Sequence, residues 1–347
     1  MSSNSLELEL QHQRRKVDFD TFDIVVQQLI TMVEKEDIDI APAYQRKFRW
    51  DKTRCSQLIE SLFLGIPVPS LSMATNKDAT WELVDGVQRI NTIIQFAGND
   101  RLRKMLGHSE PLKLFGLEKL SEFNGLRFSD LPRSMQRQFE LRPIKVVTLS
   151  DKSDKIVRFD LFERLNKGGV TLTDQEIRAC VFRGQFCDFL DKLATEQNFL
   201  SVVKFNLRQK SDGTIQETIL RFFAFHDLYK KFVHSVEGFL NEYMRDASIK
   251  FNYGYNEQLF RDTFLKLSSA LPNGIVRQNR KGVTPLILFE GVAVGAALAL
   301  EKKEKLSAED ISWIDSEELR KVTTGFTNSP QAVQKRIEFC RDRFLGK

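Results

Sequence analysis

The 347-residue sequence has few cysteines, and none of the four stands in a CxxC pair. Most of them lie in segments expected to be helical and apolar, so neither a zinc site nor a structural disulfide is predicted. The pattern is typical of reduced core or surface thiols in a cytoplasmic protein. The four residues are Cys55, Cys180, Cys187 and Cys340.

Long apolar runs are also missing. Residues Met1–Lys16 are polar and charged and carry no apolar stretch of the kind found in secretory signals. The longest apolar tract, Pro285–Leu300, is interrupted by Glu290, and the uninterrupted remainder is too short to span a bilayer. We therefore expect a buried helix at this tract, no membrane partner and a cytoplasmic location.

Neither positive nor negative residues dominate the composition. The chain has 52 Lys and Arg and 47 Asp and Glu, which gives a net charge of +5. Such a mildly basic balance permits contact with nucleic acid without requiring it. With 41% hydrophobic and 29% charged residues, the chain has the composition of an ordinary globular protein long enough for two domains.

The most informative segment that is present is Trp81–Arg89, where an apolar strand runs through Asp-Gly into an amphipathic helix. A helix N-terminus has unpaired N–H groups and a partial positive charge, which suit a phosphate. Gly86 permits close backbone approach, Arg89 can pair with anionic oxygens, and Asp85 can hold a divalent metal or orient water. The alternative is an ordinary turn and helix cap.

A second block, Ala43–Trp50, interleaves aromatic and cationic side chains at the exit of a short strand. Arg46 or Arg49 could pair with phosphate, and Tyr44 or Trp50 could stack on a base. For Trp50 we favour the alternative, in which the ring packs into the core.

Together these blocks resemble the N-terminal domain family of GmrSD-type restriction endonucleases, also catalogued as domain of unknown function 262. The fold of that family is similar to the ParB and sulfiredoxin group. The resemblance covers roughly residues 20 to 185, and the order of its blocks makes chance agreement improbable. It is carried by Tyr44-Gln45-Arg46 with Trp50, Leu58–Ser61 with Gly65–Pro69, Asp85–Arg89, Phe162–Gly169, Leu172-Thr173 and Glu176–Arg178.

The resemblance implies a component of a restriction or phage-defence system that binds and hydrolyses nucleoside triphosphate with magnesium, acting with DNA or a separate nuclease. Asp85, Gln88 and Arg89 would be catalytic, with Asp85 holding a bound magnesium or orienting a water. The nucleotide would be held by Tyr44, Gln45, Arg46, Gly86, Arg164 and Asn166. For Arg164 and Asn166, capping of a helix end at Gly168-Gly169 remains the alternative.

The sequence departs from the family at one position of the turn, which usually reads Asp-Gly-Gln-Gln-Arg. Val87 stands where the first Gln would be, and a valine side chain neither donates nor accepts a hydrogen bond. A non-hydrolysing nucleotide- or DNA-binding sensor or clamp is therefore the alternative function.

Histidines are few as well, and none of the four stands in the pattern of a His-metal nuclease, a site that relatives often carry in a second domain. A self-contained nuclease is not expected, so a partner would do the cutting. His226 is expected to be a packed residue within a helix. The others are His12, His108 and His234.

The predicted fold class is α+β. We expect a flexible arm at 1–18, a ParB/sulfiredoxin-like nucleotide-binding domain at 19–150, and an all-helical domain at 151–347. The first domain would be a small mixed sheet with packed helices. Strands are expected at about 37–41, 70–75, 80–84 and 143–149, and helices at Thr21–Glu34, 51–64 and 87–97.

Two further features concern the second domain. Thr173 followed by Glu176 predicts a capping box at a helix start. Arg277, Arg280 and Lys281 form a compact basic loop that is a weak candidate for nucleic-acid contact, with a solvated turn as the favoured alternative. The number of copies that assemble is left open.

Overall fold

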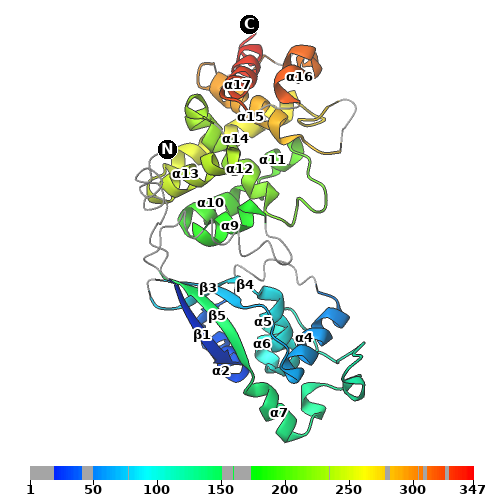
Figure 1. The fold of residues 1–347 in the computed structure, drawn as a ribbon. Helices are drawn as coiled ribbons and strands as arrows, with labels where there is room; N and C mark the ends of the chain where they lie inside the picture. The colour runs from blue at the N-terminus through cyan, green and yellow to red at the C-terminus, as the bar shows by residue number, and fades with distance from the viewer. Residues whose placement is uncertain are drawn as a thin grey trace, which may run out of the picture. The chain divides into compact units, whose positions relative to one another are not determined.

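The structure is a computed structural model that describes residues 19–40, 50–76, 78–150, 159, 173–233, 235–277, 282–303, 305–307, 311–324 and 328–347. The chain divides into two units, Met1–Thr171 and Leu172–Lys347 (Figure 1). We call their described parts the sheet unit and the helical unit. The predicted arm at 1–18 and the boundary at 150/151 stay predictions, because the arm and residues 151–158 and 160–172 lie outside the described residues.

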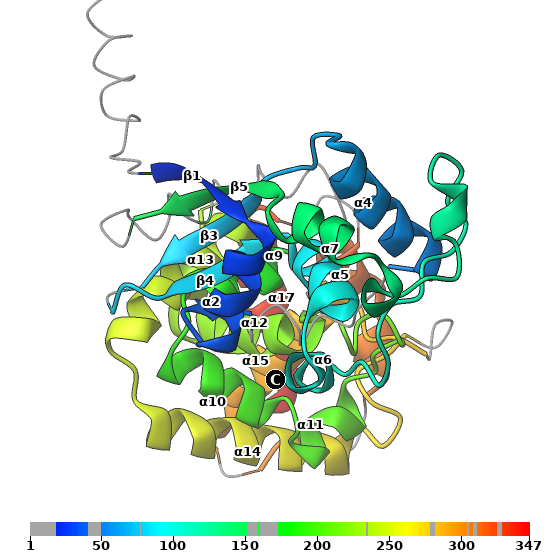
Figure 2. The ribbon, with the colours of Figure 1, turned by 90° about the horizontal axis from the view of Figure 1, so that it is seen from below.

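The sheet unit is built on a five-stranded sheet with the order β1-β5-β3-β4-β2. Strand β1 is antiparallel to β5, and β5 is parallel to β3. Strand β3 is antiparallel to β4, and β4 is parallel to β2. Figure 2 shows β1 and β5 side by side along one edge. This mixed sheet, with a helical second unit, confirms the predicted α+β class. The strands are β1 (Phe19–Val25), β2 (Ile38–Asp39), β3 (Leu71–Thr75), β4 (Trp81–Asp85) and β5 (Pro143–Leu149).

The prediction of one helix over Thr21–Glu34 is wrong in its first part. Residues Phe19–Val25 form β1, and helix α2 begins only at Val26 and runs to Glu34. All seven residues of β1 pair with β5, from Phe19 opposite Leu149 to Val25 opposite Pro143. The local apolar spacing fits either element, and a partner strand more than a hundred residues away decides between them.

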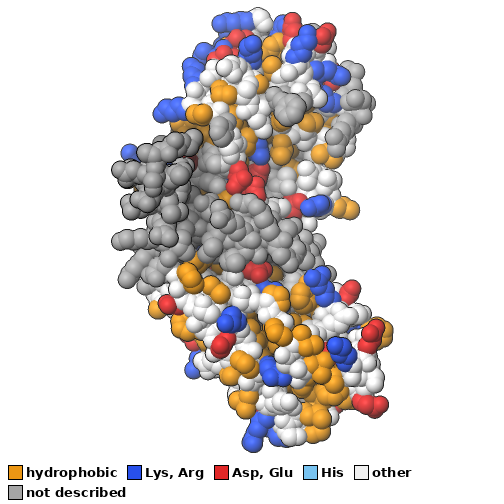
Figure 3. All heavy atoms as spheres, in the orientation of Figure 1, with side chains coloured by type: hydrophobic (Ala, Val, Ile, Leu, Met, Phe, Trp, Pro, Cys, Tyr) orange, Lys and Arg blue, Asp and Glu red, His pale blue; other side chains and the backbone are white. Residues whose placement is uncertain are grey.

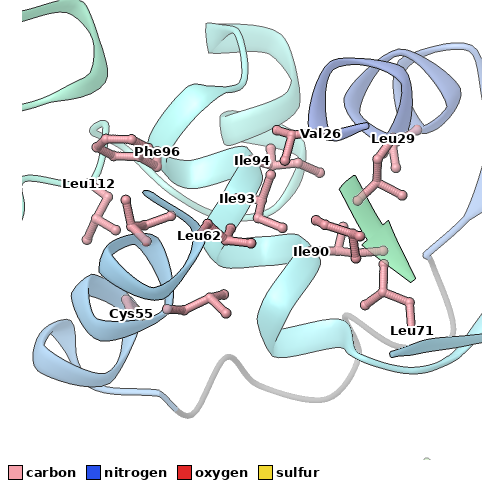
Figure 4. Packing of buried hydrophobic residues seen from close by; sticks show 14 of the residues in the cluster. Val26, Leu29, Cys55, Leu62, Leu71, Ile90, Ile93, Ile94, Phe96 and Leu112 are labelled. Atoms are coloured by element: carbon pink, nitrogen blue, oxygen red, sulfur yellow. The ribbon is translucent and has the colours of Figure 1, made fainter. Parts of the chain in front are cut away.

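Helices α4 (Lys52–Leu64) and α5 (Val87–Ala97) pack beside the sheet. The side chain of Asp51 caps α4 by accepting a hydrogen bond from the N–H of Arg54 at 2.8 Å. Figure 4 shows Ile90 and Ile93 of α5 among core side chains that come from α2 and α4. Each fully buried isoleucine of this kind stabilises the fold by about 1.5–3 kcal/mol, so α5 is firmly seated at the centre of the core. Smaller helices are α6 (Asp100–Met105) and α7 (Arg133–Glu140).

The surface of the sheet unit carries charges of both signs among hydrophobic side chains (Figure 3). Phe115 and Leu141 are each 60% exposed, and Phe19 is 58% exposed. Scattered exposed hydrophobic residues are normal in folded proteins.

In the helical unit, the predicted capping box is confirmed. Thr173 caps α9 (Asp174–Val181), and the carboxylate of Glu176 accepts the N–H of Thr173 at 2.9 Å. Helix α15 (Leu286–Leu300) is largely buried, as expected for its apolar tract, and packs on α17 (Pro330–Phe344). None of the described helices has the length and hydropathy needed to cross a membrane. The remaining helices are α10 (Gln185–Leu193), α11 (Gln197–Val202), α12 (Thr214–Leu228), α13 (Val236–Ile249), α14 (Tyr253–Ala270) and α16 (Glu317–Thr323).

Candidate functional site at the turn between β4 and α5

The turn between β4 and α5 depends on Gly86. This residue is the N-cap of α5, with φ +107°, in the left-handed region that disfavours residues with a side chain. A Cβ atom at Gly86 would lie 2.3 Å from Cδ2 of Leu71 and 3.2 Å from Nη2 of Arg89. Only glycine therefore fits here without displacing the core side chain of Leu71.

The start of α5 has the features of an anion-binding helix end. Because the N-cap is a glycine, no side chain among the described residues caps the first turn. The first backbone bond of the helix runs from the N–H of Ile90 to the carbonyl of Gly86 at 2.9 Å. The N–H groups of the residues before Ile90 lie ahead of this first helical bond and have no carbonyl acceptor within the helix. Helices bind phosphate and carboxylate at N–H groups of this kind.

Asp85 and Arg89 form an ion pair across this turn. Nη2 of Arg89 donates to Oδ2 of Asp85 at 2.6 Å and to the carbonyl of Ser70 at 3.1 Å. The Arg89 side chain is 13% exposed and that of Asp85 is 36% exposed. The buried Nε of Arg89 finds no acceptor within the described residues. The arginine expected to pair with phosphate thus lies at the turn, where it already holds the aspartate.

Gln88 points away from solvent and toward the start of α4. Its side chain is buried, and Oε1 accepts the backbone N–H of Trp50 at 3.3 Å. Trp50 packs against the hydrophobic core, as favoured from the sequence, and its ring lies 4.8 Å from the guanidinium carbon of Arg54. Gln88 therefore links the turn to the chain that enters α4.

Val87 is part of the hydrophobic core cluster and only 8% exposed. Its side chain packs inward beside the other core residues of α5. A glutamine at this position would have to bury its amide or turn it toward the neighbouring segments. Valine in place of glutamine at position 87 therefore puts an apolar side chain into the core where the family pattern has a polar one.

The described residues on either side of 41–49 are bonded to β4 and α5. Before it, Asp39 of β2 pairs with Glu82 of β4. After it, Trp50 is bonded to Gln88. Tyr44, Gln45 and Arg46 in this segment lie outside the described residues, as do Arg164 and Asn166. The structure thus brings together Asp85, Gly86, Gln88 and Arg89.

Glu82 is a carboxylate to which the sequence analysis gave no role. It lies on β4 three residues before Asp85 and is only 4% exposed. Acidic side chains are seldom buried to this extent without a structural or functional use. The signal in the sequence was a glutamate between the apolar residues Trp81 and Leu83 of the strand.

The first residue of the basic loop, Arg277, is hydrogen-bonded to other residues of the helical unit. Nη1 of Arg277 donates to the carbonyl of Ile314, and Nη2 donates to Oγ1 of Thr323. Its side chain is only 12% exposed, and Asp315 lies 3.8 Å away. Arg280 and Lys281 lie outside the described residues, so a nucleic-acid contact at this loop stays a prediction.

His226 is a packed residue of α12, as expected. Its side chain is 8% exposed, Nδ1 lies 2.8 Å from Oδ1 of Asp227, and the ring stacks on Phe222. No group of three or more His, Cys, Asp or Glu suited to a metal occurs among the described residues. Cys55, Cys187 and Cys340 form no disulfide within the described residues, and burial raises the pKa of the Cys55 thiol.

Residues 26–183, which contain the whole turn, match the family model described as GmrSD restriction endonuclease, N-terminal domain. This part of the chain belongs to that family. The GmrSD N-terminal domain begins at the first residue of α2 and ends just after α9, so it includes the first helix of the helical unit. No curated protein and no solved structure matches the chain, so the likeness to the ParB and sulfiredoxin fold group stays a prediction.

Proposed function

We propose that the chain is a nucleoside triphosphate-binding component of a restriction or phage-defence system and hydrolyses the triphosphate at the turn of Asp85–Arg89. The family match supports the system, since the matched domain is a part of restriction endonucleases. The observation that carries the site is the combination of a glycine N-cap with the paired Asp85 and Arg89 at one helix N-terminus.

The phosphates would bind at the first turn of α5. Gly86 brings the backbone within reach, and the helix end provides N–H donors and a partial positive charge. Arg89 would add a full charge. A guanidinium has five N–H donors, and the two hydrogen bonds to Asp85 and Ser70 use only Nη2. The ion pair can thus persist while another donor of Arg89 contacts phosphate.

Magnesium fits the carboxylate at this turn. The ion is usually held in nucleotide sites by one or two carboxylates together with substrate phosphates. Asp85 retains enough exposure to serve in that way while Arg89 fixes its orientation. When bound, the metal would help to neutralise the negative charge that develops on the phosphate oxygens during phosphoryl transfer.

The remaining nucleotide contacts would come from Tyr44, Gln45 and Arg46, and from Arg164 and Asn166. Gln88 would act by fixing Trp50, since its Oε1 accepts that backbone N–H. DNA, and a separate nuclease or other effector that responds to the nucleotide state, are the proposed partners.

Nucleotide-dependent unfolding and phosphate release test this proposal. ATP, GTP, CTP and UTP with magnesium are each added to the full chain, and release is measured with and without DNA. One or more triphosphates should raise the melting temperature. Asp85→Asn and Arg89→Ala should each lower release by about a hundredfold, the usual effect of removing one group that stabilises the transition state.

Arg133→Ala, at an exposed arginine of α7 in the same unit, is the matched control and should hydrolyse at the unaltered rate. If release survives both substitutions at the turn, the hydrolytic site lies elsewhere.

The second candidate is a nucleotide or DNA sensor without turnover. Val87 favours it, because the side chain at this position is core packing and cannot orient a water. In that case triphosphate raises the melting temperature, while phosphate release is no faster than in Asp85→Asn.

A further inference from the structure

The sheet unit has a pocket of about 400 Å³ beside α4 and α5. Trp50 and Lys52 line it from the start of α4, and Gln95 lines it from the last turns of α5. The segment from Gly107 to Lys113 closes the opposite side. Its volume lies within the range of small-molecule sites, which is roughly 300–1,000 Å³.

The walls of this pocket are held in place by hydrogen bonds. The N–H of Leu112 donates to the carbonyl of Gln95 at 3.0 Å, and the N–H of Phe115 donates to Oγ of Ser56 at 2.9 Å. Further along, Oε1 of Glu60 accepts the N–H of Leu120 at 2.8 Å. The segment is thereby fixed to α4 and α5, so a ligand would find a preformed site and pay little ordering entropy.

The charge lining the pocket is mainly positive. Its cations are Lys52, Lys113 and Arg127, and Glu110 is the one carboxylate among the described lining residues. Arg127 lies 3.6 Å from Glu110, and both side chains are well exposed, so this pair costs little to open. Burial lowers the pKa of His108, so this imidazole is neutral near pH 7 and adds no charge.

Two nearly buried residues of the lining are chemically unreactive. Cys55 and Leu112 are 1% and 2% exposed, and the raised pKa of the Cys55 thiol keeps it protonated. Trp50 adds a large flat ring whose main chain is fixed by Gln88. The combination of the Trp50 ring and a cationic rim suits a flat molecule that carries an anionic group.

We infer that this pocket is a second ligand site, separate from the turn of Asp85–Arg89, that takes a nucleoside monophosphate or a similar phosphorylated ring compound. The ring would lie beside Trp50, and the phosphate would contact Lys52, Lys113 and Arg127. The inference does not depend on triphosphate hydrolysis at the turn.

The test titrates the full chain with AMP, GMP, CMP and UMP without magnesium. Binding is followed by calorimetry and by tryptophan fluorescence. At least one monophosphate should bind about tenfold more tightly than inorganic phosphate or the matching nucleoside, because neither fragment uses both the ring wall and the cationic rim. The fluorescence change should disappear in Trp50→Phe, which retains Trp81 and Trp313.

Lys113→Gln and Lys52→Gln should each weaken binding by about tenfold, the effect of losing one charge-assisted hydrogen bond. Lys119→Gln is the matched control and should leave affinity unchanged. Lys119 is an exposed lysine later in the chain than Lys113, and it does not line the pocket. Calorimetry on the lysine variants decides the matter even if Trp50→Phe does not fold.

Two results would overturn the inference. The first is equal affinity in Lys113→Gln, Lys52→Gln and Lys119→Gln. The second is loss of monophosphate binding in Arg89→Ala, which would place the ligand at the turn and leave the proposed function standing. Retained monophosphate binding in Arg89→Ala, together with loss in the two lysine variants, supports a separate site.

Discussion

The two units both pair carboxylates with guanidinium groups, but they bury them to different depths. In the sheet unit, Asp85 and Arg89 belong to one helix start and keep contact with solvent. In the helical unit, Glu290 and Arg336 are at most 1% exposed and connect two helices. The difference shows which pair can exchange its partner for a ligand. Opening a pair whose carboxylate still contacts solvent costs less free energy than leaving a fully buried charge without its partner.

The buried groups of the helical unit form a continuous ionic chain across four helices. Arg178 of α9 lies 3.1 Å from Glu217 of α12, and Arg221 lies 2.7 Å from both Glu217 and Glu290. Arg336 of α17 completes it by donating to Glu290 of α15. Burial alone would raise the pKa of Glu217, but Arg221 and Arg178 hold that pKa below its ordinary value. The glutamate therefore stays charged and joins the helices at neutral pH.

The largest effect on stability is expected at Glu290. Glu290→Gln keeps the shape of the side chain but leaves two arginines, Arg221 and Arg336, without their shared carboxylate. The free energy of unfolding should fall by about 3–5 kcal/mol, as for other buried pairs that lose one partner. Urea unfolding followed by circular dichroism measures the change.

Glu257→Gln is the control for this substitution. Glu257 pairs with Lys192 and Arg261 at the surface, where the median value of a pair is about 0–1 kcal/mol. Equal losses for the two variants would mean that burial does not distinguish the ionic chain from a surface pair.

An intermediate effect is expected from Gly86→Ala in the sheet unit. The new Cβ would meet Leu71, and alanine would be held at φ +107°, so we expect a loss of about 1–3 kcal/mol. Thermal unfolding should show a lower melting temperature. Gly254→Ala serves as the control, because its Cβ meets nothing within 4 Å inside α14, and alanine favours the helix there. A neutral Gly86→Ala would show that the turn tolerates another backbone.

The smallest effect on stability is expected at Asp85. Asp85→Asn removes the ion pair with Arg89 but keeps the size of the side chain, and the carbonyl of Ser70 still accepts from Arg89. Unfolding free energy should change by no more than about 1 kcal/mol. Chemical denaturation of the same preparation used for phosphate release checks it. A loss as large as that of Glu290→Gln would make Asp85 a structural residue and remove the contrast between the units.

Much of the fold could be predicted because its signals are local. The helix at 87–97 has the predicted bounds, since its apolar spacing begins after Asp-Gly and ends before Gly98. The capping box of Thr173 and Glu176 likewise depends on residues three apart. Strand β1 could not be assigned in this way, because its partner β5 is remote in the chain.

The sequence alone determined which chemical groups gather at the turn, since Asp85, Gly86, Gln88 and Arg89 are neighbours along the chain. Only the tertiary structure decided what each group contacts beyond its neighbours: Arg89 donates to the carbonyl of Ser70, Gln88 accepts from Trp50, and Val87 packs into the core. The physical reason is that the direction of a side chain is set by the segments packed against its helix, and those segments come from distant parts of the sequence.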